Sequence, residues 1–366
     1  MKSIFGFLSL SLFISCGGGT GELDESYCET TRISGATVNG YVYSDLDFND
    51  RSMYASEMTD GDEAISGAEI TLYGAGEPIA THSCDDGSWG VSELEDGHYL
   101  AAIESEDGLC GQHNCPSRLP RAIEEGQLDI LTLGDSVPVT GDRPFFPSRL
   151  KDLLDPITSV NSVNVAIGGT LSDDWLPGGE YFNDLVAPNL EETDVVVISV
   201  GGNDILGSID ASALADPDGA VEDVRDLIAD TGLNVIAISE GIRAINPDVD
   251  VVFCLYVNYE LATISPWDLL PLVIEPGVFA GLLEEARDEL FLGQDIILVD
   301  LFGASFELDN LDDYLFDALH FNDYGHTFYA EEVFKALGGV LVGDNPLSGD
   351  PRTPLGLERS WSFVPQ

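Results

Sequence analysis

The stretch DILTLGDSVPV, residues 129–139, runs from an apolar segment directly into Gly134, Asp135 and Ser136. A short apolar run bounded by turn residues indicates a buried strand, and the Gly-Asp-Ser after it indicates a tight turn. Ser136 has two interpretations at this point. A serine is a common helix N-cap, whereas a nucleophilic serine needs a base, an acid that orients the base, and donors for an oxyanion.

Apolar runs alternate with amphipathic stretches from here toward the C-terminus. The runs lie at 129–133, 163–169, 194–204, 250–258 and 295–303. Helical periodicity appears between them, for example at 219–232 and 276–291. Strands buried on both faces that alternate with helices predict an α/β fold, a doubly wound and mostly parallel sheet of five strands. In such a sheet reactive groups collect beyond the carboxyl ends of the strands, which is where Ser136 stands.

Two histidines in this part of the chain are candidates for the base, His320 and His326. Each follows an aspartate by three residues, Asp317 and Asp323, so the spacing alone does not choose between them. The apolar-periodic stretch after His326 predicts a helix with Asp323 as its N-cap and His326 in its first turn. We therefore favour His320 as the base and Asp317 as the residue that orients it.

Donors for an oxyanion are expected at two further strand ends. Asn203, in SVGGNDI, follows the third apolar run and carries a side-chain amide. Gly169, in AIGGT, ends the second run, and its bare backbone lets an N–H approach a reacting carbonyl closely. The backbone N–H of Ser136 is the third donor. Taken singly, Gly-Gly and Asn-Asp are also ordinary turn residues.

Four short motifs follow one another along this part of the chain: Gly-Asp-Ser, a Gly five residues after an Asn, Gly-x-Asn-Asp, and Asp-x-x-His. This ordered set resembles the four blocks of the SGNH hydrolases, also called the GDSL lipase/esterase family. The resemblance covers about residues 128–337 and implies a flavodoxin-like fold and ester hydrolysis without a metal or cofactor. It also implies the roles of the residues: Ser136 is the nucleophile, His320 is the base, and Asp317 orients His320. Gly169 and Asn203 complete the oxyanion hole with the N–H of Ser136. The first block departs from the more frequent family pattern by continuing into VPV, which bears on the local pocket.

The charge of the chain excludes one class of partner. Lys and Arg number 14 against 66 Asp and Glu, a formal net charge of -52, and 44% of the residues are hydrophobic, so we expect a folded chain with an acidic surface. No basic stripe is present to neutralise phosphates, which argues against nucleic acid as a partner. Such a surface repels itself where screening is weak, so we expect a saline habitat or a lineage with acidic composition.

The N-terminus predicts export. Its apolar run, residues 4–14, follows a lysine and is too short to span a bilayer. FISC followed by three glycines resembles a bacterial lipoprotein signal, in which Cys16 carries the lipid; Phe13 departs from that pattern, so plain secretion is the alternative. We expect a protein of the cell envelope or surface that meets the membrane only through a lipid at Cys16.

An oxidising compartment gives the cysteines a role. Two disulfides with open pairing are predicted among Cys28, Cys84, Cys110 and Cys115. Free thiols are one alternative, and a zinc site with His113 is another, although the spacing matches no common finger. Cys254 lies in a buried-strand pattern and is predicted to be a small core residue.

Short β-type runs separated by Gly, Asp and Ser clusters predict a small β-sandwich before the α/β domain. The segment 36–104 resembles the prealbumin-like repeats of bacterial surface adhesins and carboxypeptidase regulatory domains, where the module is a spacer or a binding unit. Oxygen ligands for calcium alternate at Asp45, Asp47 and Asn49. Because Asp50 stands where an EF-hand needs glycine, a solvated acidic loop is the favoured interpretation.

These observations divide the chain into a signal peptide (1–16), a tether (17–33), a β-sandwich (34–115), a linker (116–127), a hydrolase domain (128–340) and a C-terminal tail (341–366). The function expected is a serine ester hydrolase. The alternatives are a non-catalytic surface adhesin or glycan-binding protein on a hydrolase fold, and a carbohydrate O-acetylesterase. The apolar stretch 262–279 is expected either to line an acyl pocket or to pack against the domain. Acyl length, leaving group and oligomeric state stay open.

Overall fold

The computed structural model describes residues 7–13, 38–45, 63–64, 66–91, 94–104, 119–206, 217–262, 278–286, 290–291 and 294–342. Several predicted features lie outside these ranges: Cys16, Cys28, Cys110, Cys115, His113, Asp47, Asn49 and Asp50. No helix within the described ranges is long and apolar enough to cross a membrane.

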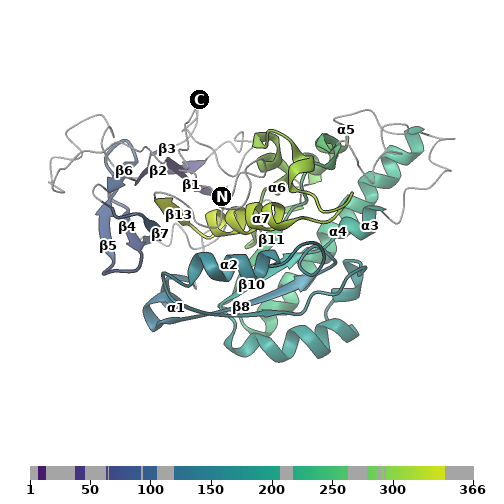
Figure 1. The fold of residues 1–366 in the computed structure, drawn as a ribbon, viewed down its shortest axis with the longest axis horizontal. Helices are drawn as coiled ribbons and strands as arrows, with labels where there is room; N and C mark the ends of the chain where they lie inside the picture. The colour runs from purple at the N-terminus through teal and green to yellow at the C-terminus, as the bar shows by residue number, and fades with distance from the viewer. Residues whose placement is uncertain are drawn as a thin grey trace, which may run out of the picture.

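Five parallel strands form the central sheet, and Figure 1 labels β8, β10 and β11 among them. They are β8 (Gln127–Gly134), β9 (Ser159–Asn164), β10 (Val195–Ser199), β11 (Asp250–Cys254) and β12 (Ile297–Val299). Their order is β12-β11-β10-β8-β9, so the first strand lies between the second and the third. This is the flavodoxin-like order of a doubly wound sheet, and it confirms the predicted fold class.

Alternate residues of the buried strands pack into two separate cores. In β10, Val195 and Val197 join the core on the face covered by α2 (Phe146–Leu154) and α7 (Asp323–Ala336), which lie side by side. Val196 and Ile198 join the core on the other face. That face is covered by much of α4 (Pro217–Ile245) and by the helical turns η2 (Asp173–Trp175), η3 (Phe182–Val186) and η4 (Ala187–Glu192). Burial on both faces is why β10 is apolar at four consecutive positions, Val195–Ile198.

The second strand ends earlier than the sequence pattern predicts. It covers Ser159–Asn164 instead of 163–169. The side chain of Asn164 turns the chain there, because its amide donates to Pro138 O at 2.9 Å and its Oδ1 accepts from Ala166 N at 3.1 Å. Residues 165–169 therefore form a loop beyond the sheet edge, which places Gly169 near the end of β8.

The remaining helices connect or flank these strands. They are α1 (Leu119–Glu125), α3 (Gly202–Leu206), α5 (Val278–Ala286) and α6 (Leu301–Ala304), with turns η6 (Tyr259–Leu261), η9 (Ser305–Glu307) and η10 (Leu311–Tyr314). α1 lies in the segment predicted as a linker, and α4 extends well beyond the predicted 219–232.

Two antiparallel sheets are formed by the strands that precede the α/β domain and by one strand that follows it. One contains β1 (Phe7–Phe13), β2 (Val38–Asp45), β3 (Glu63–Ala64) and β6 (Ser88–Val91). The other contains β4 (Glu69–Tyr73), β5 (Ile79–His82), β7 (Gly97–Glu104) and β13 (Gly339–Val342). Ile70 and Leu72 of β4 share a core with Trp89 of β6 and Val340 of β13. We call this pair of sheets the N-terminal module.

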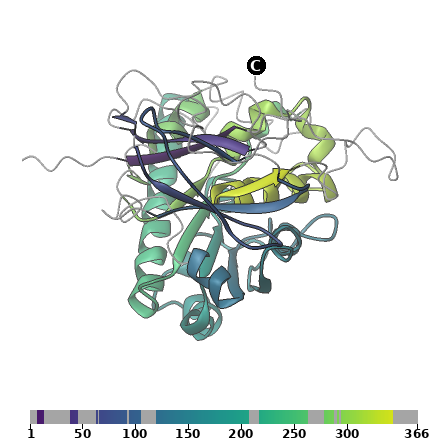
Figure 2. The same cartoon turned by 90° about the vertical axis from the view of Figure 1, so that its left-hand side faces the viewer.

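The last strand, β13, connects the C-terminal end of the α/β domain to the N-terminal module. It follows α7 almost directly and pairs antiparallel with β7, which Figure 2 shows as the yellow strand beside a blue one. It crosses the boundary expected at residue 340. His98 adds to this junction: its Nδ1 donates to Leu153 O of α2 at 2.8 Å, and its ring lies 6.2 Å from that of Phe334 in α7. The module is thus packed on the same helices that cover the sheet.

Two cysteines are within the described ranges. Cys84 is disulfide-bonded, with its partner outside those ranges. Cys254 is free and fully buried in β11, which confirms the prediction that it is a small core residue.

Candidate active site

A sharp turn at the end of β8 presents Ser136. Gly134 has a φ of +153°, and a Cβ added there would lie 2.0 Å from Ser199 O of β10, so only glycine permits this approach. Asp135 N donates to the same carbonyl at 3.0 Å, and Asp135 Oδ1 accepts from Val137 N at 3.0 Å. The hydrogen bonds on both sides of Ser136 fix the turn that carries its hydroxyl.

Ser136, His320 and Asp317 form one continuous hydrogen-bonded chain. Ser136 Oγ lies 3.0 Å from His320 Nε2, and His320 Nδ1 lies 2.9 Å from Asp317 Oδ2. Because the carboxylate accepts from Nδ1, the hydrogen of a neutral imidazole is on Nδ1, and Nε2 is the nitrogen that can accept a proton from the hydroxyl. The structure thus brings together three residues that are up to 184 positions apart.

Asp317 is held as a carboxylate. Partial burial would by itself raise its pKa, but the hydrogen bonds from the His320 ring and from the backbone N–H groups of Leu319 and His320 outweigh that effect. The pKa of Asp317 therefore lies below its ordinary value. An ionised carboxylate at this place orients the imidazole and stabilises it when it becomes charged.

The loop that carries His320 is fastened at several points. Leu315 and Phe321 form an isolated antiparallel bridge, and Phe316 N donates to His320 O at 2.7 Å. Tyr259, which follows β11, donates its hydroxyl to Leu319 O at 2.6 Å. The sequence gives no local indication of this contact, because Tyr259 lies 60 positions from Leu319.

His326 has a different environment from His320. It is fully buried, its Nδ1 accepts from Phe146 N at 3.3 Å, and its Nε2 lies 3.2 Å from Thr140 O. Burial lowers the pKa of His326 to about 4, so the ring is neutral near pH 7. The expected N-cap is wrong by one residue: Asn322, and not Asp323, caps α7 by accepting from Gly325 N.

Asp323 is drawn away from the cap by Arg149 of α2, with which it forms an ion pair. Both nitrogens of His326 are engaged by backbone groups of other segments. His320 is therefore the histidine of this pair that lies beside Ser136.

The predicted oxyanion donors lie on the loops next to Ser136. Asn203 is in the first turn of α3, and its amide donates to Thr170 O at 2.9 Å, which ties it to the loop after β9. In that loop a Cβ added at Gly168 would lie 3.7 Å from Ser136 Cβ, and Gly169 next to it has a φ of +86° with nothing within 4 Å of an added Cβ. The chain bends here in a conformation that glycine adopts at least cost.

The buried environment of Asp135 is a feature of the site that the Gly-Asp-Ser motif does not predict. It is 2% exposed, and its second oxygen accepts from the hydroxyl of Tyr256, which follows β11. Burial raises the pKa of Asp135 to about 6, although the hydrogen bonds from Tyr256 and Val137 act in the opposite direction. This buried pair supports the Ser136 turn from behind, and no sequence motif connects residues 121 positions apart.

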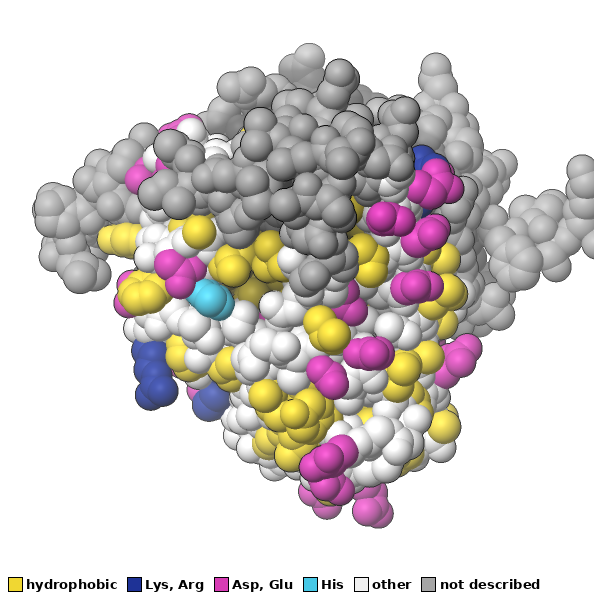
Figure 3. Space-filling model, turned by 90° about the vertical axis from the view of Figure 1, so that its right-hand side faces the viewer, with side chains coloured by type: hydrophobic (Ala, Val, Ile, Leu, Met, Phe, Trp, Pro, Cys, Tyr) yellow, Lys and Arg dark blue, Asp and Glu magenta, His cyan; other side chains and the backbone are white. Residues whose placement is uncertain are grey.

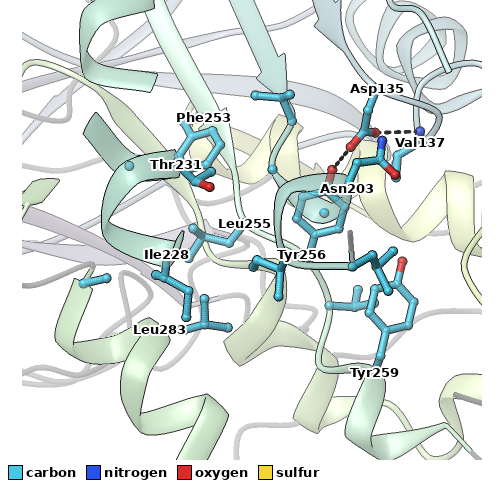
Figure 4. A pocket seen from close by; sticks show the side chains of 18 of the residues that line it. Asp135, Val137, Asn203, Ile228, Thr231, Phe253, Leu255, Tyr256, Tyr259 and Leu283 are labelled. Carbon is cyan, nitrogen blue, oxygen red and sulfur yellow. Dashed lines mark hydrogen bonds between the residues drawn. The ribbon is translucent and has the colours of Figure 1, made fainter. Parts of the chain in front are cut away.

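A pocket that opens to solvent begins at Ser136. Ser136, Asp135 and Asn203 line one part of it, and the remaining lining is mostly apolar. Figure 4 shows Ile228, Leu255 and Leu283 on the side away from Asp135 and Asn203. Figure 3 shows a face of the molecule where hydrophobic side chains gather in a hollow beside a histidine, with acidic side chains scattered around them. In the described part of the chain, no three His, Cys, Asp or Glu side chains are grouped to hold a metal ion.

Comparisons with known proteins identify relatives of the α/β domain. The sequence model of the GDSL-like Lipase/Acylhydrolase family matches residues 132–328. Among solved structures, the chain is similar to the lipase Lip_vut3 from a goat rumen metagenome, with 20% identity, a TM-score of 0.46, and coverage of 58% of this chain and 98% of the other.

Two further structures are similar over the same share of the chain. A lipase/acylhydrolase from Enterococcus faecalis has 18% identity and a TM-score of 0.40, with 58% of this chain and 95% of the other covered. Axe2, an acetylxylan esterase from Geobacillus stearothermophilus, has 17% identity and a TM-score of 0.38, with 58% and 94% covered. No curated protein matches the chain.

Proposed function

The chain belongs to the GDSL-like lipase/acylhydrolase family, and on that premise we propose that it is a serine ester hydrolase that forms an acyl-enzyme on Ser136. The observation that carries the proposal is the hydrogen-bonded chain from Ser136 Oγ through His320 to Asp317, with contacts of 3.0 and 2.9 Å. A serine that only capped a helix would need neither a histidine nor a carboxylate in line with its hydroxyl.

The reaction follows from the positions of these groups. His320 Nε2 takes the proton of Ser136 as Oγ attacks the ester carbonyl, and Asp317 stabilises the imidazolium that results. The N–H groups of Ser136 and Gly169 and the amide of Asn203 donate to the oxyanion. The C–O bond to the alcohol breaks, and His320 returns its proton to the leaving oxygen. Water, deprotonated by His320, then attacks the acyl-enzyme and releases the carboxylic acid and free Ser136. No step requires a cofactor.

We also propose that the enzyme is exported and held at the cell envelope by a lipid on Cys16, with a carboxylic ester as its substrate. The apolar run of residues 4–14 and the cysteine after it support this placement. The non-catalytic adhesin is the less favoured function, because binding alone makes no use of an imidazole aligned with a serine hydroxyl.

Substitution of the nucleophile tests the proposed function. We expect the full chain to hydrolyse p-nitrophenyl acetate, and Ser136→Ala to lower kcat by a factor on the order of 10⁴ to 10⁶, because the covalent step is lost. The assay is run at low and high salt, since the acidic surface repels itself where screening is weak. Circular dichroism of both proteins is the control for folding. Equal turnover by the two proteins, or none by a folded wild type on any ester, contradicts the proposal.

A further inference from the structure

We propose that the pocket beside Ser136 holds the acyl part of the substrate, and that this acyl group is an apolar chain of medium length rather than an acetyl group. The inference rests on the proposed function and deepens it by naming the substrate class. It also assigns the residues that set acyl length, which are Ile228 of α4, Leu283 and Ala286 of α5, and Phe253 and Leu255 at the end of β11.

The lining of the pocket separates reacting groups from apolar groups. Ser136 and Asn203 lie in the same pocket as Ile228, Leu283 and Phe253, and Figure 4 shows the apolar side chains on the side away from Asn203. An ester whose carbonyl carbon meets Ser136 Oγ and whose oxyanion meets Asn203 therefore has an apolar compartment available for the rest of its acyl chain.

The charges in the lining exclude other acyl groups. The described lining contains no lysine, arginine or histidine, so nothing there neutralises a carboxylate or phosphate on the acyl group. The single acidic residue, Asp135, is engaged by the Tyr256 hydroxyl and by Val137 N. A sugar-like acyl group needs several hydrogen-bond partners, and an alkyl chain needs none.

Residues of both cores of the domain line the pocket. Ile228 of α4 belongs to the core shared with α2 and α7, whereas Phe253 belongs to the core on the other face of the sheet. Two glycines of the lining allow neighbouring side chains to pack closely against the backbone beside it. A Cβ added at Gly201 would lie 2.7 Å from Thr231 Cγ2, and one added at Gly232 would lie 2.6 Å from Leu290 Cδ1. The apolar compartment is thus part of the fold of α4 and β11.

The expected effect on specificity follows from burial of methylene groups. Each methylene that moves from water into the pocket raises kcat/KM by about fourfold, the equivalent of about 0.8 kcal/mol. We therefore expect kcat/KM of the wild type to rise by at least about 10²-fold from p-nitrophenyl acetate to the octanoate ester.

The test replaces a residue of the pocket lining by a larger one, which reduces the space for the acyl chain. Leu283 is half-buried and lines the pocket, so Leu283→Trp shortens the compartment without touching Ser136, His320 or Asn203. We expect this variant to lower the ratio of kcat/KM for the octanoate to kcat/KM for the acetate by about tenfold or more. The matched control is Leu233→Trp on α4, because Leu233 is 52% exposed and lies outside the pocket lining. The control is expected to hydrolyse both esters like the wild type.

Each result separates this inference from the proposed function. Ser136-dependent hydrolysis of the acetate with no gain for the octanoate overturns the acyl pocket and leaves the esterase standing. An equal loss on both esters in Leu283→Trp also overturns it. Absence of hydrolysis of either ester by a folded wild type removes the proposed function itself. If Leu283→Trp fails to fold, Ala286→Leu on the same helix fills the same wall with a smaller change, and the same comparison applies.

Discussion

His320 and His326 each follow an aspartate by three residues, but they differ in burial and therefore in what their rings can do. The His320 side chain is 18% exposed and keeps Nε2 beside Ser136, whereas His326 is fully buried with backbone groups at both nitrogens. The Asp-x-x-His spacing predicted both as candidates, and the helical periodicity after His326 was the observation that separated them. The structure shows why His326 does not act with Ser136: its neutral ring has no solvent contact and accepts a hydrogen bond that links α7 to α2.

The buried imidazole of His326 is expected to make stability depend on pH. The unfolded chain binds a proton on this ring below its ordinary pKa of 6.5, and the folded chain does so only below about 4. The folded state therefore binds fewer protons in that interval, and the stability contributed by the neutral ring is lost as the pH falls from about 6.5 to about 4. His326→Gln keeps an acceptor for Phe146 N and a donor for Thr140 O and does not titrate.

Urea unfolding of both proteins measures the effect. Between about pH 7 and pH 4.5, we expect the wild type to lose about 2 kcal/mol more free energy of unfolding than His326→Gln. At neutral pH the variant is the less stable protein, because it loses the ring contacts with Phe145 and Phe321. A difference between the two proteins that stays constant with pH would show that His326 does not remain neutral on folding.

At the scale of elements, the His320 loop depends on a contact from η6, the turn that follows β11. Tyr259 donates to Leu319 O, one residue before His320, and Tyr259 is 5% exposed. Tyr259→Phe removes that hydrogen bond and keeps the ring. We expect kcat to fall about five- to tenfold with KM little changed, because a bond worth about 1 kcal/mol no longer holds the base in line with Ser136. Steady-state kinetics on the acetate ester give both parameters.

Tyr99→Phe is the matched control for that variant. Its hydroxyl donates to Glu95 O at 2.9 Å, the same kind of bond in the N-terminal module. This control is expected to keep the kcat of the wild type. A Tyr259→Phe variant that raised KM and kept kcat would mean that the hydroxyl serves the pocket wall and not the position of the base.

The elements also show where sequence patterns are informative. The cores of β10 and β11 are predictable because both strands are buried on both faces and four of the five residues in each are apolar. β9 is an edge strand with the sequence SVNSVN, so its polar residues concealed it and shifted the prediction to the apolar run after it. The three residues of the hydrogen-bonded chain, Ser136, His320 and Asp317, are predictable from short local motifs. Tyr256 and Tyr259 were not, because each acts through a contact distant in sequence.

At the scale of the whole molecule, β13 makes the N-terminal module part of the α/β fold. Four residues, GVLV, follow α7 and complete a sheet whose other strands lie more than 200 positions earlier. Such a short apolar run predicts burial and cannot name its partner, which is why it was assigned partly to a tail. The junction with β7 and the contacts of His98 with α2 and α7 couple the two units through the helix that follows His320.

This coupling predicts that the module and the catalytic domain lose their structure together. Val340 of β13 is 1% exposed in the core shared with Ile70, Leu72 and Trp89. Val340→Asp places an unpaired carboxylate there, and we expect the midpoint of heat inactivation to fall by about 10 °C, because the damaged junction destabilises α7 as well. Ester hydrolysis after timed heating measures inactivation, and calorimetry of the same samples measures unfolding. Ile245→Asp, at a position 46% exposed on α4, is the control for an added charge.

Independent units would instead give two calorimetric transitions. Val340→Asp would then move only the transition of the N-terminal module, and ester hydrolysis would survive that transition. A single transition that moves together with activity would mean that the module, beyond any role as a spacer, maintains the position of α7, the helix that follows His320.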